Sequence, residues 1–142
     1  MLVQAPRGRL RNASFSPNGH YIALVSDETG RDEVYVQATP PATFRTKVSI
    51  TGGALPRWRA DGKELFFVST DDGSPMMAVD VDTGATFSAG IPRPLFKTGG
   101  GPNLVGGYAV RADGQQFLMP GRTAQAETWP ITVVLNWWVE LE

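Results

Sequence analysis

One short pattern recurs three times along the chain, and it constrains the fold more than any other feature of the sequence. Residues 15–26 align without gaps with residues 58–69, and a third copy spans residues 110–119. Each copy has an apolar residue, a turn that ends in Asn-Gly or Asp-Gly, two mostly polar residues and then at least three apolar ones. Self-similarity of this kind is the signature of a repeat architecture, so the chain is expected to repeat one structural unit.

The turn in each copy has the residues that a type I hairpin turn requires. The three turns are Pro17-Asn18-Gly19, Ala60-Asp61-Gly62 and Ala112-Asp113-Gly114. Proline suits the first central position because its φ is fixed at about −65°, and alanine fits there without strain. Asn or Asp suits the second position, and glycine takes the left-handed position that follows. Three copies of one turn predict three copies of one hairpin.

The strand after each turn is apolar on both faces. The three runs are Tyr21–Val25, Leu65–Val68 and Phe117–Met119. A strand with one face in water alternates apolar and polar residues, whereas a continuous apolar run indicates that both faces are covered. Each sheet is therefore expected to lie between two others.

Each unit is expected to contain four antiparallel strands. A polar hairpin loop follows each repeated strand and leads into a third strand, and these third strands are predicted at residues 33–36, 76–81 and 131–135. Short fourth strands are predicted at residues 47–53 and 94–100, while the third unit has no clear fourth strand beyond residues 139–141. The turn glycines recur after 43 and 52 residues, against roughly 40–45 residues for a propeller blade. The glycine-rich segment 99–103 accounts for the longer interval.

These features predict an all-β fold, namely a β-propeller fragment of about three four-stranded antiparallel blades. Within residues 1–142, blade one is expected at about 10–53, blade two at about 54–100 and blade three at about 104–142. The 16 glycines and 11 prolines imply frequent turns, so long helices are not expected.

The first unit resembles the TolB-type, WD-repeat-like propeller repeat. Its segments Phe15–Gly19, Ile22–Ser26 and Glu33–Val36 are similar to the aromatic-Ser-Pro-Asp-Gly turn, the strand and the Ile/Val-Tyr-Val strand of that repeat. Units two and three differ from it because they have Arg-Ala in place of Ser-Pro. The closing segment Pro130–Trp138 is similar to the C-terminal end of large bacterial proteins that carry such propellers behind a Ser/Thr protein kinase domain. The resemblance implies a propeller, and it slightly favours a periplasmic or other extracytoplasmic compartment.

Three blades cannot close a ring, because closed propellers hold 4–8 blades. Both outermost sheet faces are then expected to expose more apolar surface than a monomer usually tolerates. Two copies of the chain give a six-bladed ring by the closed symmetry of homodimers, so we expect a homodimer. The alternative is that further blades of a longer parent chain cover these outermost faces.

Composition excludes several kinds of partner and site. Lys and Arg number 13 against 14 for Asp and Glu, so the basic surface that nucleic acids select is missing and no nucleic-acid partner is expected. No segment reaches the roughly 18 apolar residues of a membrane span, and residues 1–11 lack the apolar run of a signal peptide. The absence of cysteine excludes disulfides, Cys-based metal sites and thiol catalysis.

Asp82-Thr83-Gly84 matches the aspartic protease signature, and Leu104-Val105-Gly106 matches its downstream apolar-apolar-Gly element. Retroviral-type proteases are homodimers that share one Asp from each copy. The motif nevertheless falls between the third and fourth strands of unit two, where a tight turn uses the same residues, and about eighty residues precede it. We interpret it as a turn.

The only histidine, His20, is the only candidate base for a Ser-His-Asp arrangement. Its equivalents in the other units are Lys63 and Gln115, which indicates a solvated position after the turn. One histidine without cysteine cannot form a transition-metal site. The acidic loop residues do not have the calcium-loop spacing; they are Asp27-Glu28, Asp32-Glu33 and Asp71-Asp72.

Two further motifs are also interpreted as loops. Lys97-Thr98-Gly99-Gly100-Gly101 reverses the Gly-Lys-Ser/Thr order that a phosphate-binding loop requires. Asn12-Ala13-Ser14 is a glycosylation sequon, which has meaning only in a eukaryotic secretory setting. The sequence therefore predicts no catalytic, cofactor-binding or metal-ligating residue, and no cofactor.

The aromatic residues at strand positions are expected in the core; they are Phe15, Tyr35, Trp58, Phe66 and Phe67. Trp137-Trp138 ends a strand, where one ring points to each side of the sheet. One of these two rings is a candidate contact with a partner or with missing blades.

The function that follows is a non-catalytic propeller segment that acts as a scaffold for a protein, peptide or small ligand. If the resemblance holds, the parent protein is a kinase-linked sensor or regulatory protein, or a TolB-like envelope component. The alternative is the propeller portion of a prolyl-oligopeptidase-like hydrolase whose catalytic residues lie outside this chain, because no Gly-x-Ser-x-Gly elbow occurs here.

Overall fold

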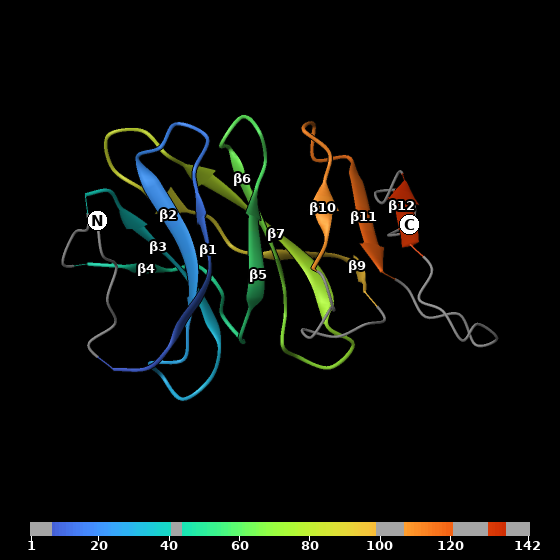
Figure 1. The fold of residues 1–142 in the computed structure, drawn as a ribbon, viewed down its shortest axis with the longest axis horizontal. Helices are drawn as coiled ribbons and strands as arrows, with labels where there is room; N and C mark the ends of the chain where they lie inside the picture. Colours follow the sequence, from blue (N-terminus) through green and yellow to red (C-terminus); the bar gives the residue numbers. More distant parts are fainter. Residues whose placement is uncertain (1–6, 41–43, 99–106, 121–130, 136–142) are drawn as a thin grey trace.

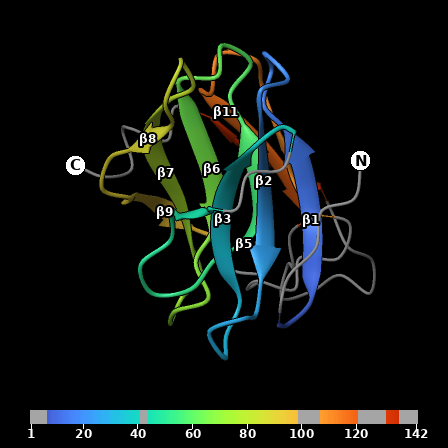
Figure 2. The ribbon, with the colours of Figure 1, turned by 90° about the vertical axis from the view of Figure 1, so that its left-hand side faces the viewer.

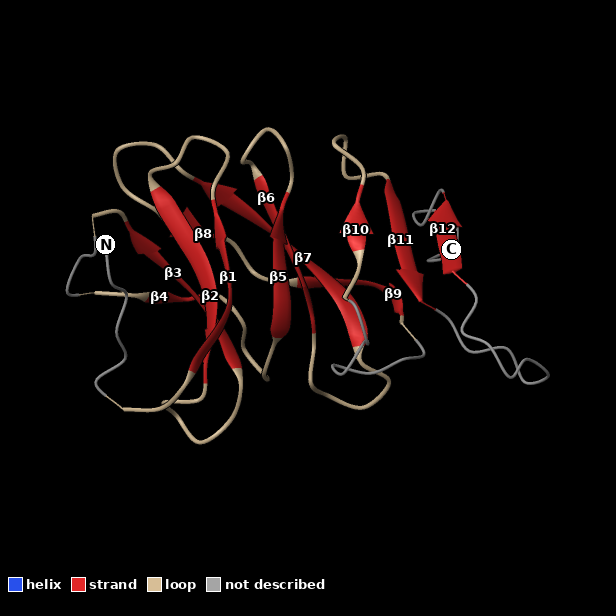
Figure 3. Ribbon diagram, in the orientation of Figure 1, coloured by secondary structure: helices blue, strands red, loops and turns tan. Residues whose placement is uncertain are grey.

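The computed structural model describes residues 7–40, 44–98 and 107–120, and the backbone of residues 131–135. All regular structure in this part of the chain is β-strand, and Figure 3 shows no helix in it. The strands form three antiparallel sheets that stand side by side in chain order (Figure 1). The chain is thus all-β with the sheet arrangement of a β-propeller fragment, as the repeats predict.

Sheet one has four strands in the order β1-β2-β3-β4. They are β1 (Leu10–Phe15), β2 (Tyr21–Ser26), β3 (Glu33–Ala38) and β4 (Thr46–Lys47). The fourth strand is shorter than the predicted 47–53. The amide N–H of Val34 donates to the Ser49 side chain (2.8 Å) instead of a backbone carbonyl, so regular pairing stops where Ser49 takes its place.

Sheet two has five strands, with the outer position shared between two of them. The strands are β5 (Ala54–Trp58), β6 (Glu64–Val68), β7 (Pro75–Asp82), β8 (Ser88–Ala89) and β9 (Arg93–Lys97). β9 pairs with the first half of β7, close to the predicted fourth strand, whereas β8 pairs only with Val81 and Asp82. The eight-residue β7 extends beyond the end of β9, and β8 pairs with the part of β7 that β9 does not reach.

Sheet three has the order β10-β11-β12. Its strands are β10 (Ala109–Val110), β11 (Gln116–Pro120) and β12 (Ile131–Leu135). β12 spans the predicted third strand of this unit. The predicted fourth strand at residues 139–141 lies outside the described residues, and the blade boundaries given above stay predictions.

The three repeated turns have the same hydrogen bonds. In each, the glycine N–H donates to the carbonyl three residues earlier, at 2.8 to 2.9 Å. The next amide donates to the Asn or Asp side chain two residues back, at 2.9 to 3.0 Å. Gly19, Gly62 and Gly114 have φ of 74°, 73° and 74°, where a Cβ would be strained. The prediction of one turn in three copies is confirmed.

The segments that lead into the three turns share a feature that the sequence does not reveal. Asn12, Leu55 and Gly107 each lie seven residues before their turn glycine, and each has a left-handed φ, of 53°, 55° and 71°. In β1 and β5 this residue falls within a break in the pairing register, as in a β-bulge. Asn, Leu and Gly have no common chemistry, so only the backbone geometry is repeated.

The core consists mainly of two layers between neighbouring sheets. In β6, Leu65 and Phe67 face sheet one, where they pack with β2 and β3. Phe66 and Val68 face the other way and pack with Phe117 and other residues of sheet three. Complete burial of such side chains is worth about 1.5–3 kcal/mol each. The prediction that the apolar run of the second unit has both faces covered is therefore confirmed.

The outer face of sheet one differs from its prediction. Ile22, Leu24 and Tyr35 point away from sheet two, yet they form a third buried cluster against which Leu10 packs. Figure 2 views the molecule from the side of sheet one. On the same face Gln37 accepts a hydrogen bond from Arg45 (2.9 Å), so polar side chains share it with the apolar ones. The expectation that this outermost face exposes a large apolar surface is therefore wrong for these residues, which are buried.

Candidate functional site

At one end of the sheets, connections from two neighbouring sheets contact each other. The three repeated turns lie at this end, which is the top of Figure 1, and so does the β7–β8 connection. We call it the turn end. Asn18 of the first turn donates to the Thr83 carbonyl (2.9 Å), so the first turn is joined directly to the β7–β8 connection.

A groove of about 250 Å³ opens at the turn end, between sheet one and the β7–β8 connection. Its lining is mostly apolar and consists of Tyr21, Val36, Gln37, Ala38, Phe44, Thr46, Ala85, Thr86 and Phe87. The Tyr21 phenol is the only titratable group among these nine residues. The groove therefore offers shape and hydrogen bonding rather than acid–base chemistry.

Tyr21 fixes the geometry of the groove. Its ring lies 5.5 Å from that of Phe87 between centroids, at an angle of 50°. Its hydroxyl donates to the Gly84 carbonyl (2.7 Å), so the β7–β8 connection is held against sheet one. Phe44 is 83% exposed although it lines this apolar groove. The groove thus has a fixed aromatic wall and an uncovered aromatic side chain.

The Asp-Thr-Gly motif forms part of that connection. The Asp82 carboxylate accepts a hydrogen bond from the Gly84 amide (2.8 Å), which is the geometry of an Asx turn. The carbonyls of Thr83 and Gly84 accept from Asn18 and Tyr21 of sheet one. In the structure the motif is a turn that joins two sheets. The downstream segment 104–106 lies outside the described residues.

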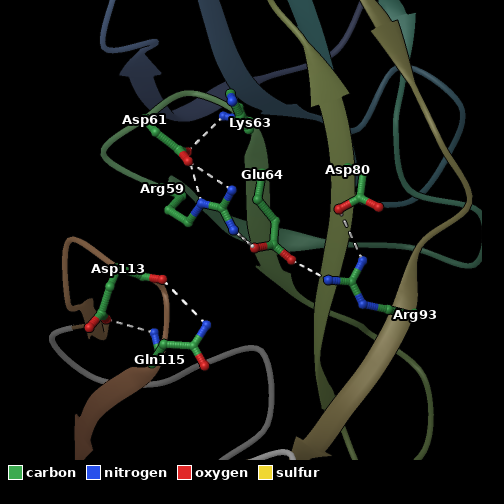
Figure 4. Close-up of polar contacts among 8 residues, drawn as sticks. All are labelled: Arg59, Asp61, Lys63, Glu64, Asp80, Arg93, Asp113 and Gln115. Atoms are coloured by element: carbon green, nitrogen blue, oxygen red, sulfur yellow. Dashed lines mark hydrogen bonds and ion pairs between the residues drawn. The ribbon is translucent and has the colours of Figure 1, made fainter.

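A second hollow at the turn end, of about 550 Å³, has charged walls. It is lined by Arg59, Asp61, Gly62, Lys63, Asp80, Val81, Asp82 and Thr83. Figure 4 shows a chain of ion pairs beside it, which runs from Asp61 through Arg59, Glu64 and Arg93 to Asp80. Opposite charges alternate along this chain, so most of them are already paired within the protein.

Arg59 sets the electrostatics of this cluster. Its guanidinium donates to both oxygens of Asp61 at 2.8 Å, and this lowers the pKa of Asp61 to about 2. The same contacts raise the pKa of Arg59. Arg59 also donates to Glu64 (2.8 Å), a buried carboxylate that Arg93 contacts from the opposite side. These groups hold a turn and the strands β6 and β9 together.

The acidic loops and the histidine lie where no site is assembled. His20 is exposed, and its side chain makes no hydrogen bond or ion pair within the described residues. Arg11 forms ion pairs with Asp32 (2.6 Å) and Asp27 (3.5 Å), so both carboxylates are already paired with an arginine. Over the described ranges no group of three or more acidic or histidine side chains has the arrangement of a metal site.

The other predicted loop motifs are partly described. Thr98 donates its hydroxyl to the Ser74 carbonyl (2.9 Å) and so anchors the end of β9, while residues 99–101 lie outside the described part. Asn12 of the sequon lies in β1 at its left-handed position. Trp137 and Trp138 lie outside the described residues, so their predicted contact stays a prediction.

The predicted core aromatics are buried with one exception. Tyr35, Trp58, Phe66 and Phe67 are buried, whereas Phe15 is 61% exposed, so the prediction for Phe15 is wrong. Its repeat equivalent Trp58 packs against the preceding sheet, whereas no described sheet precedes Phe15. The sequence analysis missed the aromatic groove because its exposed residues come from connections that do not follow the repeat.

Comparisons with known proteins agree with the fold. No protein-family model matches the chain, and no curated protein matches it. Among solved structures, a candidate 6-phosphogluconolactonase from Bacteroides uniformis is similar with a TM-score of 0.57 and 18% identity. The match covers 94% of this chain and 42% of that one. At this identity the similarity shows the fold alone.

Two further solved structures are similar at lower scores. TolB from Acinetobacter baumannii has a TM-score of 0.41 and 16% identity, over 91% of this chain and 41% of that one. The β-propeller domain of the trilobed protease from Pyrococcus furiosus has a TM-score of 0.47 and 17% identity, over 87% and 40%. The chain thus spans about two fifths of the length of these three structures.

The sheets and the comparison together define a propeller scaffold. Its described residues bring two hollows to the turn end, one apolar and one charged. None of them forms a helix long and apolar enough to cross a membrane.

Proposed function

We propose that the chain is a non-catalytic propeller scaffold that binds an extended peptide segment of a partner protein in the groove at the turn end. The observation that carries this proposal is Phe44, an aromatic side chain that is 83% exposed although it lines an apolar groove. Aromatic side chains dominate the energetics of protein interfaces. Covering Phe44 with an apolar side chain of the peptide would remove this exposed surface from water.

The edge of sheet one supports an extended peptide as the occupant. β4 is the outermost strand of this sheet, and no described strand pairs with its outer edge. It has only two residues, Thr46 and Lys47, both exposed, and Thr46 also lines the groove. An unpaired edge beside an apolar pocket is the arrangement by which extended peptides add to a sheet.

In a longer parent protein this scaffold would serve as a sensor or regulatory region. The similarity of Pro130–Trp138 to the ends of kinase-linked propeller proteins supports this part of the proposal. Peptide binding at the groove would then be the signal to which such a region responds.

The experiment is a selection from a phage-displayed peptide library on the purified chain, followed by fluorescence polarisation with one labelled selected peptide. The test variant is Phe44→Ala. The matched control is Ile91→Ala, because Ile91 is equally exposed at 83% but does not line the groove. We expect Phe44→Ala to weaken binding by about tenfold or more and Ile91→Ala to leave it unchanged.

Two results would overturn the proposal. One is a selection that yields no peptide with a measurable affinity. The other is an equal affinity of the selected peptide for wild type and Phe44→Ala, which would place binding elsewhere.

A further inference from the structure

The three turns stack in chain order, each against the one before. A Cβ placed on Gly62 would lie 3.7 Å from Pro17 of the first turn, and one on Gly114 would lie 2.8 Å from Arg59 of the second turn. A Cβ on Gly19 would meet nothing within 4 Å. Gly62 and Gly114 are buried, whereas Gly19 is exposed because no described turn lies against it. We call this end of the stack the head.

Phe15 marks the head in a second way. It occupies the repeat position of Trp58, which is buried and donates its indole N–H to the Ser14 carbonyl of the preceding sheet (3.0 Å). Phe15 is instead 61% exposed. Ile22 and Leu24 on the outer face of sheet one are buried, whereas Phe15, next to the first turn, is open to a partner.

The opposite end of the stack, which we call the tail, is open at the third turn. Arg111 pairs with Asp113 as Arg59 pairs with Asp61, but the Arg111 side chain is 60% exposed against 23% for Arg59. Gly114 covers Arg59, and no described turn covers Arg111 in the same way.

Leu118 adds an apolar group to the tail. It occupies the position of Phe66, which is buried with its ring 5.1 Å from that of Phe117. Leu118 is 43% exposed. At the contact of sheets two and three, sheet three covers Arg59 and Phe66 of sheet two. The tail exposes an arginine and an apolar side chain at the equivalent positions.

We propose that a second copy of this chain continues the stack, with the head of one copy on the tail of the other. Gly19 of one copy would lie against Arg111 of its partner, and Phe15 would cover Leu118. The same contact forms twice about a twofold axis and closes a ring of six sheets, which is within the 4–8 blades of closed propellers.

Continuity with the internal contacts favours a second copy as the occupant. The chain carries both halves of the contact, and each half repeats residue positions that are already joined within the chain. The length of the chain also fits, since it matches 42% of the Bacteroides structure, so two copies supply most of a propeller of that size. This inference concerns surfaces outside the peptide groove and goes beyond the proposed function.

The test is the mass of the 142-residue chain by size-exclusion chromatography with light scattering. We expect twice the 15.4 kDa of one chain for wild type at micromolar concentration. Phe15→Ser and Leu118→Glu should each give a single chain, because each removes both copies of the contact. The control Ile91→Glu introduces a charge at a position that is as exposed as Phe44 and lies in neither surface, so it should stay dimeric.

Thermal unfolding separates lost association from lost folding. The variants are expected to unfold cooperatively, and only wild type and the Ile91 control should have a Tm that rises with protein concentration. A wild-type mass of one chain, or Phe15 and Leu118 variants that both stay dimeric, would overturn the inference. Either result would leave peptide binding by Phe44 unaffected, so the two proposals fail separately.

Discussion

The indole nitrogen of Trp58 donates a hydrogen bond of 3.0 Å to the backbone carbonyl of Ser14, and this bond ties the first strand of sheet two to the first strand of sheet one. A similar bond joins the next two sheets, where the Tyr108 hydroxyl donates to the Leu55 carbonyl (2.9 Å). In both cases an aromatic ring is buried between sheets while its polar atom binds the backbone of the preceding sheet. The contact between sheets thus combines hydrophobic burial with one specific hydrogen bond.

Replacing Trp58 with phenylalanine should weaken both parts of this contact. Trp58→Phe removes the N–H donor to the Ser14 carbonyl, and its smaller ring leaves part of the buried space unfilled. We expect a loss of about 2–3 kcal/mol in the free energy of unfolding. Urea titration at fixed protein concentration should show a lower midpoint with an unchanged m value. Ile91→Ala is the control and should leave the midpoint unchanged.

Two turn glycines allow backbone strain to be separated from steric conflict. Gly62 and Gly114 have φ of 73° and 74°, so alanine at either position costs about 1 kcal/mol for the left-handed backbone. At Gly62 the new Cβ meets only ordinary contacts, the nearest of them Thr83 at 3.4 Å. At Gly114 it would lie 2.8 Å from Arg59 and 3.1 Å from Phe66.

We therefore expect Gly114→Ala to lose about 1–3 kcal/mol more than Gly62→Ala, because overpacking adds to the strain. Chemical denaturation of both variants under the same conditions measures the difference. Equal losses would show that the third turn does not press on the second in solution.

Much of this fold follows from local residue chemistry. The Asn/Asp-Gly turns have the predicted backbone because each position requires a particular φ and a particular side-chain acceptor. The apolar run Leu65–Val68 is covered on both faces because alternate residues of a strand face opposite sides. Such features depend on residues close in sequence, so a single sequence can reveal them.

Features that depend on distant residues could not be predicted in this way. The left-handed Leu55 follows from the propeller geometry of its strand and not from its own preference. The exposure of Phe15 depends on whether another sheet precedes it. The groove of Phe44 and Phe87 arises where two connections from different sheets meet, and neither connection carries a repeated pattern that would have marked it.

The buried Glu64 offers a test of the charged cluster. Glu64→Gln keeps the shape of the side chain but removes the negative charge between Arg59 and Arg93. Two guanidinium groups would then face each other across an amide, so we expect a loss of about 2–3 kcal/mol in the free energy of unfolding. The measurement is urea denaturation at neutral pH.

Asp80→Asn is the matched control, because Asp80 also pairs with Arg93 but its side chain is 80% exposed. Exposed pairs contribute little, so this change should stay within about 0.5 kcal/mol. If both variants lose the same amount, burial of Glu64 does not determine the strength of the cluster.

The ion pair of Asp61 and Arg59 predicts how stability responds to acid. The hydrogen bonds from Arg59 lower the pKa of Asp61 from 3.8 to about 2 in the folded chain. The unfolded chain therefore binds this proton first as the pH falls, so the contribution of Asp61 is complete above pH 3.8 and is lost on the way down to about pH 2.

Asp61→Asn removes the titrating carboxyl but keeps a side-chain oxygen for the Lys63 amide, as Asn18 does in the first turn. Thermal unfolding across this pH range should give a shallower decline for the variant than for wild type. Parallel declines would mean that water screens this half-exposed pair completely, and that other carboxylates determine the acid response.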